Sequence, residues 1–222
     1  IAASNDALSR VVGTSTDVLW ERTAKGAAIT TPRVASVAGT GHVVVVRDGG
    51  QGGNVFAGWL TEDGAKLSEL SAIKATAGLV GTPAVGASTH GVLVAFAAKT
   101  AATDPWHVEL GVAQTPKVPA EARAFALPAS GPGGEAISPA VEALEDGRFV
   151  LQWTEGSAGN RAVRAQMLSA DLEPVADAVT LSSADQNAGQ GALWVKGSQV
   201  LALFLVQKEA SHELWGASLR CQ

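Results

Sequence analysis

The chain repeats itself, and this internal repetition limits its fold more than any other feature. Each unit opens with a short segment of small residues, which is followed by a glycine turn, an apolar run and a polar loop. A third, alternating segment and a further turn complete the unit. The opening segments are residues 31–34, 82–85 and 138–141, with a fainter copy at 190–193. Repeats of roughly 50 residues, each with four short strands, are typical of the blades of a β-propeller.

The third unit carries the pattern most completely. Asp146-Gly147 forms its turn, and an apolar run from Phe149 to Trp153 follows. Residues 161–167 then alternate between polar and apolar side chains. Alternation with period two between glycine turns indicates strands rather than helices. Residues 121–127 could form a short helix, but their place in the repeat makes them a fourth strand.

We therefore predict an all-β fold, a β-propeller of about four four-stranded blades that forms one domain over residues 1–222. The first three blades are expected at about residues 31–81, 82–137 and 138–189. The fourth would combine residues 190–222 with residues 1–30. Small residues open each unit, which suits innermost strands that crowd a narrow axis.

The two ends of the chain are expected to meet in one blade. The last unit lacks a fourth strand, and residues 17–22 match that position, since Gly13 precedes Pro32 by the same interval as Gly64 precedes Pro83. The N-terminal strand would then complete the C-terminal blade and remove exposed sheet edges. An eight-bladed ring built from two chains, or a piece of a longer precursor, is the alternative.

The pattern Pro-x-Val … Asp-Gly-x-Phe-Val-x-x-Trp, carried by Pro139, Asp146, Gly147, Phe149 and Trp153, resembles the repeats of secreted bacterial β-propeller proteins. The chain has no Trp-Asp signature of the WD type, no paired glycines of the kelch type and no Ser-x-Asp-x-Gly-x-Thr-Trp box of the sialidase type. The resemblance implies a propeller in an extracellular, cell-surface or periplasmic protein. Because the sequence opens without Met, we expect that an N-terminal segment has been removed. It implies no particular reaction.

Charge and composition exclude several classes of protein. The net charge is −5, from 16 Lys and Arg against 21 Asp and Glu, whereas a nucleic-acid-binding protein usually carries a basic excess. Even the longest apolar runs, such as residues 200–206, are far shorter than the roughly 20 residues of a membrane-spanning helix. The single cysteine, Cys221, excludes a scaffold held by several disulfides. It could form an intermolecular disulfide, or lie as a buried thiol on the last strand.

No motif for catalysis, for a metal or for a cofactor is present, so we expect no metal and no cofactor, and the sequence favours a non-enzymatic role without deciding it. The glycine-rich residues 48–54 match neither a phosphate-binding nor a calcium-binding loop and suit a flexible connection. A glycosidase would need two carboxylates about 5–10 Å apart, and Asp104 and Glu155 are the best pair in the loops. The histidines show no metal-ligand spacing; they are His42, His90, His107 and His212.

The loops between second and third strands should lie at the same end of the ring as the connections between blades. Loops from every blade meet there, which makes this end the expected ligand face. Both signs of charge occur on it, and Trp106 is the best candidate for stacking on a sugar ring. The candidate binding residues are Arg47, Asp48, Asp104, Trp106, Glu155, Asn160, Lys208 and His212.

The leading expectation is a non-catalytic binding or assembly module of a secreted or surface bacterial protein. It would present its loop face to a protein partner or to a glycan, and to neither nucleic acid nor a membrane. One alternative is a carbohydrate-binding, lectin-like domain or a glycoside hydrolase. Another is a subunit of a larger surface assembly, as a homo-oligomer or with a partner cut from the same precursor.

Overall fold

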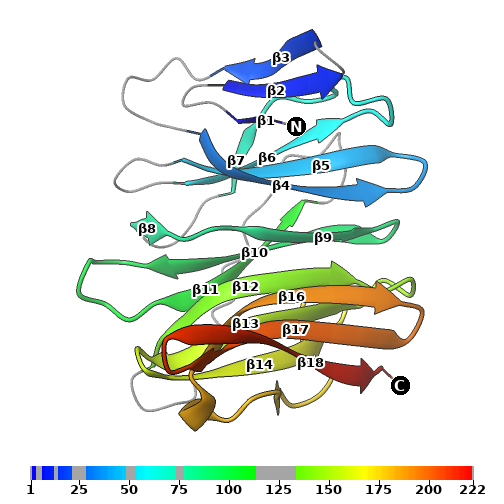
Figure 1. Cartoon of the computed structure of the whole chain (residues 1–222). Helices are drawn as coiled ribbons and strands as arrows, with labels where there is room; N and C mark the ends of the chain where they lie inside the picture. The colour runs from blue at the N-terminus through cyan, green and yellow to red at the C-terminus, as the bar shows by residue number, and fades with distance from the viewer. Residues whose placement is uncertain are drawn as a thin grey trace.

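The computed structural model describes residues 2–3, 7–12, 15–21, 29–48, 54–73, 78–113 and 134–221. Figure 1 shows these residues as a series of antiparallel β-sheets stacked one upon the next in chain order. The fold is all-β, and two of its sheets have four antiparallel strands joined in sequence. Within the described residues, no helix has the length and apolar character needed to cross a membrane.

The strands of the first two sheets come from the N-terminal third of the chain. The first sheet has the order β1 (Ala2–Ala3), β2 (Ala7–Val12), β3 (Ser15–Glu21). The second has the order β4 (Ile29–Val37), β5 (Gly41–Asp48), β6 (Val55–Leu60), β7 (Ser71–Ile73).

The other three sheets follow in the same way. The third contains β8 (Leu79–Val80), β9 (Ala84–Ser88), β10 (Gly91–Lys99) and β11 (His107–Ala113), with β8, β9 and β11 all paired to β10. The fourth has the order β12 (Ala136–Ala143), β13 (Phe149–Ser157), β14 (Asn160–Leu168), β15 (Val179–Thr180). The 3₁₀ turn η1 (Ala184–Gln186) leads to the fifth, of order β16 (Ala188–Lys196), β17 (Gln199–Lys208), β18 (Ser211–Arg220).

The apolar pattern of each central strand follows from the number of faces that are covered. Seven consecutive residues of β10, Val92 to Ala98, are buried, because sheets pack on both faces of this strand. In β17 the buried residues Val200, Ala202, Phe204 and Val206 alternate with more exposed ones, since the fourth sheet covers only one face. The other face of the fifth sheet exposes apolar side chains, including Trp194, Leu201 and Leu214.

The strands β4, β9, β12 and β16 each lie at the edge of their sheet that faces a common cavity, and we call them the inner strands. Three of them have a register irregularity where a residue other than glycine has a positive φ: Thr31 at 48°, Ser138 at 51° and Gln190 at 54°. The corresponding point of the second unit, Thr82, lies in the break between β8 and β9. The opening residue of each repeat therefore marks a bulge or a break in the inner strand.

The expected closure by the N-terminal strand is not what the sheets show. Residues 17–21 belong to β3, which pairs with β2 in a sheet of its own, whereas β18 pairs with β17. Figure 1 shows the first sheet at the top of the view and the fifth in the lower half, beside the fourth. The described residues accordingly form five sheets instead of four blades. The expected fourth strand at residues 121–127 lies outside the described residues.

Burial of an aromatic side chain explains where the N-terminal strand packs. Trp20 is 4% exposed, and its ring lies over Gly58 of β6. Its Nε1 donates a hydrogen bond to the Ser68 carbonyl at 3.0 Å. Leu19 and Trp20 form a cluster with Val44 and other residues of the second sheet, so β3 is held against that sheet.

Replacement of Trp20 by alanine should lower the free energy of unfolding by about 3–5 kcal/mol, because it removes a buried aromatic side chain and leaves a cavity. The matched control is Trp194→Ala, since Trp194 is 52% exposed and should cost less than about 1 kcal/mol. Urea unfolding followed by circular dichroism measures both. Equal losses for the two variants would contradict the placement of the N-terminal sheet.

Candidate functional site

The first residues of β12 and β16 lie at the same end of the strands as the β13–β14 and β17–β18 hairpins. Ala136, the first residue of β12, is opposite Glu155, and Ala188, the first residue of β16, is opposite Val206. Each partner lies close to the hairpin that ends its own strand. Polar loop residues from different sheets are therefore brought to a common end of the structure.

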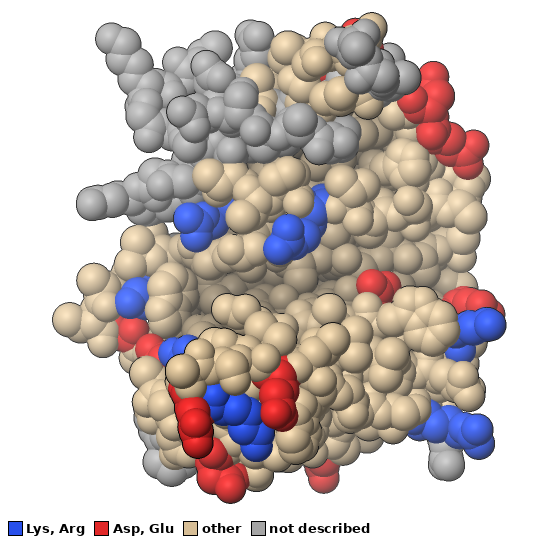
Figure 2. All heavy atoms as spheres, in the orientation of Figure 1, with Lys and Arg blue, Asp and Glu red and all other residues tan. Residues whose placement is uncertain are grey.

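A central cavity of about 600 Å³ lies between the four inner strands. Its walls combine small side chains, such as those of Ala84, Ala140 and Ala192, with polar and charged ones. Figure 2 shows the surface hollowed across the middle of the face over these strands. Its volume lies within the roughly 300–1,000 Å³ that is usual for binding sites of small molecules.

Equivalent residues of successive repeats form the polar part of the central cavity. Thr82, Ser138 and Gln190 all line it, and each is the opening residue of its unit. The positive φ of Ser138 and Gln190 costs roughly 1 kcal/mol or more for a residue other than glycine. Such strain tends to occur at functional sites. Here it places a hydroxyl and an amide beside the cavity.

Two charged side chains also line the central cavity, Arg33 from β4 and Glu142 from β12. Removal of the Glu142 carboxyl from water raises its pKa above the ordinary value of a glutamate. Glu142 is the one carboxylate among the described residues that line this cavity. The cavity thus offers hydrogen-bond donors and acceptors, together with one carboxyl group whose pKa is raised by burial.

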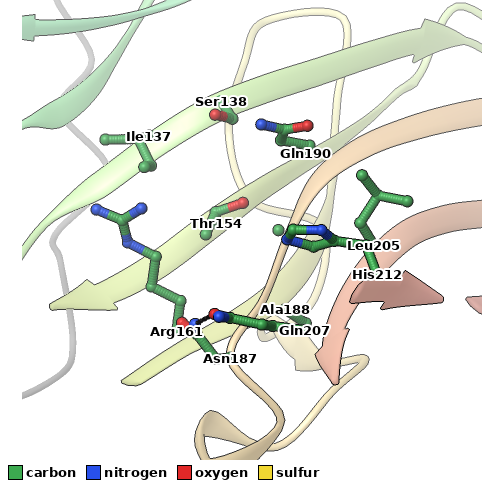
Figure 3. Close-up of a pocket in the computed structure, with 11 residues that line it drawn as sticks. Ile137, Ser138, Thr154, Arg161, Asn187, Ala188, Gln190, Leu205, Gln207 and His212 are labelled. Atoms are coloured by element: carbon green, nitrogen blue, oxygen red, sulfur yellow. Dashed lines mark hydrogen bonds between the residues drawn. The ribbon is translucent and has the colours of Figure 1, made fainter. Parts of the chain in front are cut away.

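A second, smaller cavity of about 240 Å³, the intersheet pocket, adjoins the central cavity between the fourth and fifth sheets. The two cavities share Ser138 and Gln190. Figure 3 shows Thr154 of β13 and Arg161 of β14 on one side of this pocket and His212 of β18 on the other. Asn187 donates an amide hydrogen bond to Gln207 at its edge.

Two polar atoms at the intersheet pocket are buried and have no hydrogen-bond partner in the protein. One is Oγ1 of Thr154, a residue that is 2% exposed, and the other is Nε of Arg161. Arg161 Nη2 lies 3.4 Å from Glu135 Oε2, which is long for a charged pair. A buried group without a partner costs about 1–3 kcal/mol, so both atoms call for an explanation.

Glycines of β16 allow the fifth sheet to approach β13 closely. A Cβ on Gly191 would lie 1.8 Å from Gln152 Nε2, and a Cβ on Gly189 would lie 3.2 Å from the Thr154 side chain. Gln152 is fully buried and donates a hydrogen bond to the Leu203 carbonyl at 3.1 Å. Gly189 lines the intersheet pocket and Gly191 the central cavity, so the walls of both depend on the absence of side chains at these positions.

Several residues expected at the ligand face are engaged in local structure. Arg47 donates a hydrogen bond to the Val80 carbonyl at 3.1 Å, and Asp104 accepts one from the Ala101 amide at 2.9 Å. The Lys99 ammonium lies 4.8 Å from the ring centre of Trp106. The backbone of Asp48 lies in β5, and its side chain lies outside the described part of the structure.

Glu155 is buried at 7% exposure, where it accepts a hydrogen bond from Trp153 Nε1 at 3.1 Å and faces Arg164 at 3.4 Å. Asn160 is exposed at the start of β14, and the Lys208 ammonium lies 5.4 Å from the ring centre of Trp215. Among the described lining residues of the two cavities, His212 alone comes from the predicted set.

Sequence reasoning missed the other polar residues of the two cavities. The signal for Thr82, Ser138 and Gln190 was available, because they are the opening residues of aligned units. Arg161 directly follows the predicted Asn160. Nothing in the sequence distinguishes Thr154 or Glu142, since their importance depends on burial.

Cys221 is a free cysteine that lines a third cavity of about 420 Å³ with apolar neighbours such as Val150 and Leu219. Partial burial raises the pKa of its thiol, which lowers its reactivity as a thiolate. Among the described residues, no group of three or more His, Cys, Asp or Glu side chains is placed to hold a metal ion.

Replacement of Thr154 by valine should leave the free energy of unfolding unchanged or raise it by about 1 kcal/mol. The reason is that the variant keeps the branched shape and removes a buried hydroxyl that has no partner. Chemical unfolding of the two proteins measures the difference. A loss of more than about 2 kcal/mol would show that the hydroxyl is satisfied in the folded protein.

The raised pKa of Glu142 predicts a pH-dependent effect of Glu142→Gln. The folded state holds the proton more tightly than the unfolded state. The contribution of Glu142 to stability therefore falls as the pH rises from the ordinary glutamate pKa to the raised pKa of the folded state. Glutamine does not ionise. The variant should therefore gain thermal stability relative to the original chain as the pH rises above about 4, the ordinary pKa of a glutamate. A melting-temperature difference that is constant over this range would contradict the desolvation of Glu142.

Comparison with known proteins gives a fold and no family. No family model and no curated protein matches the chain. Among solved structures, a thermostable family-43 glycoside hydrolase matches with a TM-score of 0.54 and 14% identity, over 87% of this chain and 69% of the other. An α-L-arabinofuranosidase from Lactobacillus brevis matches with a TM-score of 0.53 and 11% identity, over 92% and 78%.

An endo-arabinase from Bacteroides thetaiotaomicron matches with a TM-score of 0.52 and 13% identity, over 94% of this chain and 84% of the other. Similarity at such low identity concerns the fold alone. The chain therefore shares the all-β, propeller-like architecture of these glycoside hydrolases, which agrees with the class of fold that the repeats predict.

Proposed function

We propose that this chain is a non-catalytic glycan-binding module that holds a sugar in the central cavity. The observation that carries the proposal is the composition of the cavity wall. Equivalent polar residues of three repeats line it, together with Arg33 and a single carboxylate among the described residues. The similarity in fold to proteins named as glycoside hydrolases supports a carbohydrate ligand and no specific reaction.

The chemistry of the central cavity suits a hydroxylated ligand. A sugar ring presents several hydroxyls, each able to donate and to accept a hydrogen bond. Ser138 and Thr82 supply hydroxyls, Gln190 an amide, Arg33 donors and Glu142 an acceptor. The small alanine side chains of the wall leave room for the ring.

A glycoside hydrolase is the second candidate, because structures with that name share the fold. Hydrolysis with general acid and base requires two carboxyl groups that face the same glycosidic bond. Asp104 and Glu155, the pair expected from the sequence, are engaged with the Ala101 amide and with Trp153 and Arg164. Glu142 lines the central cavity, but neither Asp104 nor Glu155 is among its described lining residues, so no pair of carboxylates is formed there. Binding without hydrolysis is therefore the better-supported role.

The location of the protein is also a proposal. The resemblance of the repeats to secreted bacterial propellers supports a secreted or surface protein. A glycan-binding module would meet its ligands in that setting.

The decisive experiment measures binding and hydrolysis with the same oligosaccharides. Calorimetry against a panel that includes arabinan and xylan fragments should show binding, and an assay of reducing ends should show no release of sugar. Glu142→Gln should weaken binding less than tenfold, because glutamine keeps a hydrogen-bonding oxygen. The matched control is Glu145→Gln, which changes an exposed carboxylate in the turn between β12 and β13.

Release of sugar that disappears in Glu142→Gln would overturn the proposal in favour of a glycoside hydrolase. Failure of every oligosaccharide of the panel to bind would overturn the carbohydrate proposal itself.

A further inference from the structure

The intersheet pocket is rich in hydrogen-bond donors. Arg161 supplies a guanidinium group, whose Nη2 lies 3.4 Å from Glu135 Oε2, and His212 supplies an imidazole. Thr154 and Ser138 carry hydroxyls. No carboxylate occurs among its described lining residues, although the whole chain has a net charge of −5. A pocket lined by donors and by no carboxylate among its described residues favours an anionic ligand over a cationic one.

The unpartnered atoms of this pocket specify what the ligand must do. Thr154 Oγ1 and Arg161 Nε are buried without a hydrogen-bond partner in the protein. Nε of an arginine can only donate, so its missing partner is an acceptor. The Thr154 hydroxyl can donate to the same acceptor group. A ligand with two acceptor oxygens would therefore satisfy both atoms.

The size of the pocket limits what it can hold. Its volume of about 240 Å³ is below the range of about 300–1,000 Å³ for sites that enclose a whole small molecule. Ser138 and Gln190 belong to both cavities, so one ligand can extend from the pocket into the central cavity. Figure 3 shows these two residues together at one side of the pocket.

We propose that the intersheet pocket binds the carboxylate of an acidic sugar whose ring extends past Ser138 and Gln190 into the central cavity. The planar pair of carboxylate oxygens matches the guanidinium group of Arg161 and reaches the Thr154 hydroxyl. His212, from the opposite wall, adds a third donor. This inference rests on the proposed glycan binding and names the ligand class as uronic-acid-containing oligosaccharides.

The test compares an oligouronate with its methyl ester, which keeps every hydroxyl and loses the negative charge. Calorimetry with the full chain should show binding of the acid at least tenfold tighter than binding of the ester. Arg161→Gln should reduce this preference to less than threefold while leaving the affinity for the ester in place. Thr154→Val should weaken binding of the acid several-fold. Rising salt concentration should weaken binding of the acid more than that of the ester.

The matched control is Arg148→Gln, since Arg148 lies in the turn at the opposite end of β13 and pairs with Asp146 at 2.7 Å. It should bind acid and ester as the original chain does. Circular dichroism checks the fold of each variant. If Arg161→Gln does not fold, Thr154→Val together with the acid–ester comparison decides the question, because removal of that hydroxyl leaves the packing unchanged.

The outcomes separate this inference from the proposed function. Equal binding of acid and ester would overturn the carboxylate site and leave glycan binding standing. Binding of neither ligand, nor of any neutral oligosaccharide, would overturn both. Inorganic phosphate that competes as strongly as free uronate would make the pocket a general anion site and would also overturn the carboxylate assignment.

Discussion

The structure depends on the close approach of neighbouring sheets, which glycine permits at each junction. A Cβ on Gly58 would meet Trp20 at 2.9 Å, and one on Gly111 would meet Ile73 at 2.6 Å. The next two junctions repeat this arrangement, with Gly86 against Val141 at 2.8 Å and Gly191 against Gln152 at 1.8 Å. At each junction a side chain of one sheet occupies the space that a glycine of its neighbour leaves open. Protein interiors are packed densely, so a methyl group at these points would force the sheets apart.

The same crowding shapes the candidate site. Because β9, β12 and β16 lie close together, the opening residues of three repeats come to one central cavity. The bulges turn Ser138 and Gln190 into a left-handed backbone conformation, and a perfectly regular strand would have no such residues. Two small cavities thus arise from the packing of ordinary strands, without any long inserted loop among the described residues. The polar residues that line the central cavity therefore come from the repeat units themselves.

The repeats were sufficient to predict the class of fold, since period-two alternation and glycine turns act locally. The prediction for residues 17–22 was wrong about their partner, because alignment of Gly13 with Gly64 gives position in a unit and says nothing of tertiary packing. The Leu19–Trp20 pair finds an apolar surface on the adjacent sheet, and β2 supplies the hydrogen bonds. A strand before Gly13, at residues 7–12, was the missed signal for a separate hairpin.

The site was harder to predict than the fold, for a physical reason. Sequence reasoning chose charged loop residues such as Asp104 and Glu155, but these carboxylates satisfy nearby donors in their own loops and strands. Thr154 looks like any strand residue until its burial and its lack of a partner are known. A polar group is available to a ligand when it is held in place and has no hydrogen-bond partner in the protein. That condition depends on three-dimensional contacts.

The fifth sheet is covered on one face only, as the exposed Trp194, Leu201 and Leu214 show. Each sheet packs mainly on the sheets that precede and follow it in the chain, as in a repeat array, so a terminal sheet has half of the usual support. Its backbone amides should therefore exchange with solvent through local opening at a lower free energy than those of β10. The intersheet pocket lies at this weakly supported junction. A ligand bound in this pocket would contact both the fourth and the fifth sheet, and it should slow amide exchange throughout β16, β17 and β18.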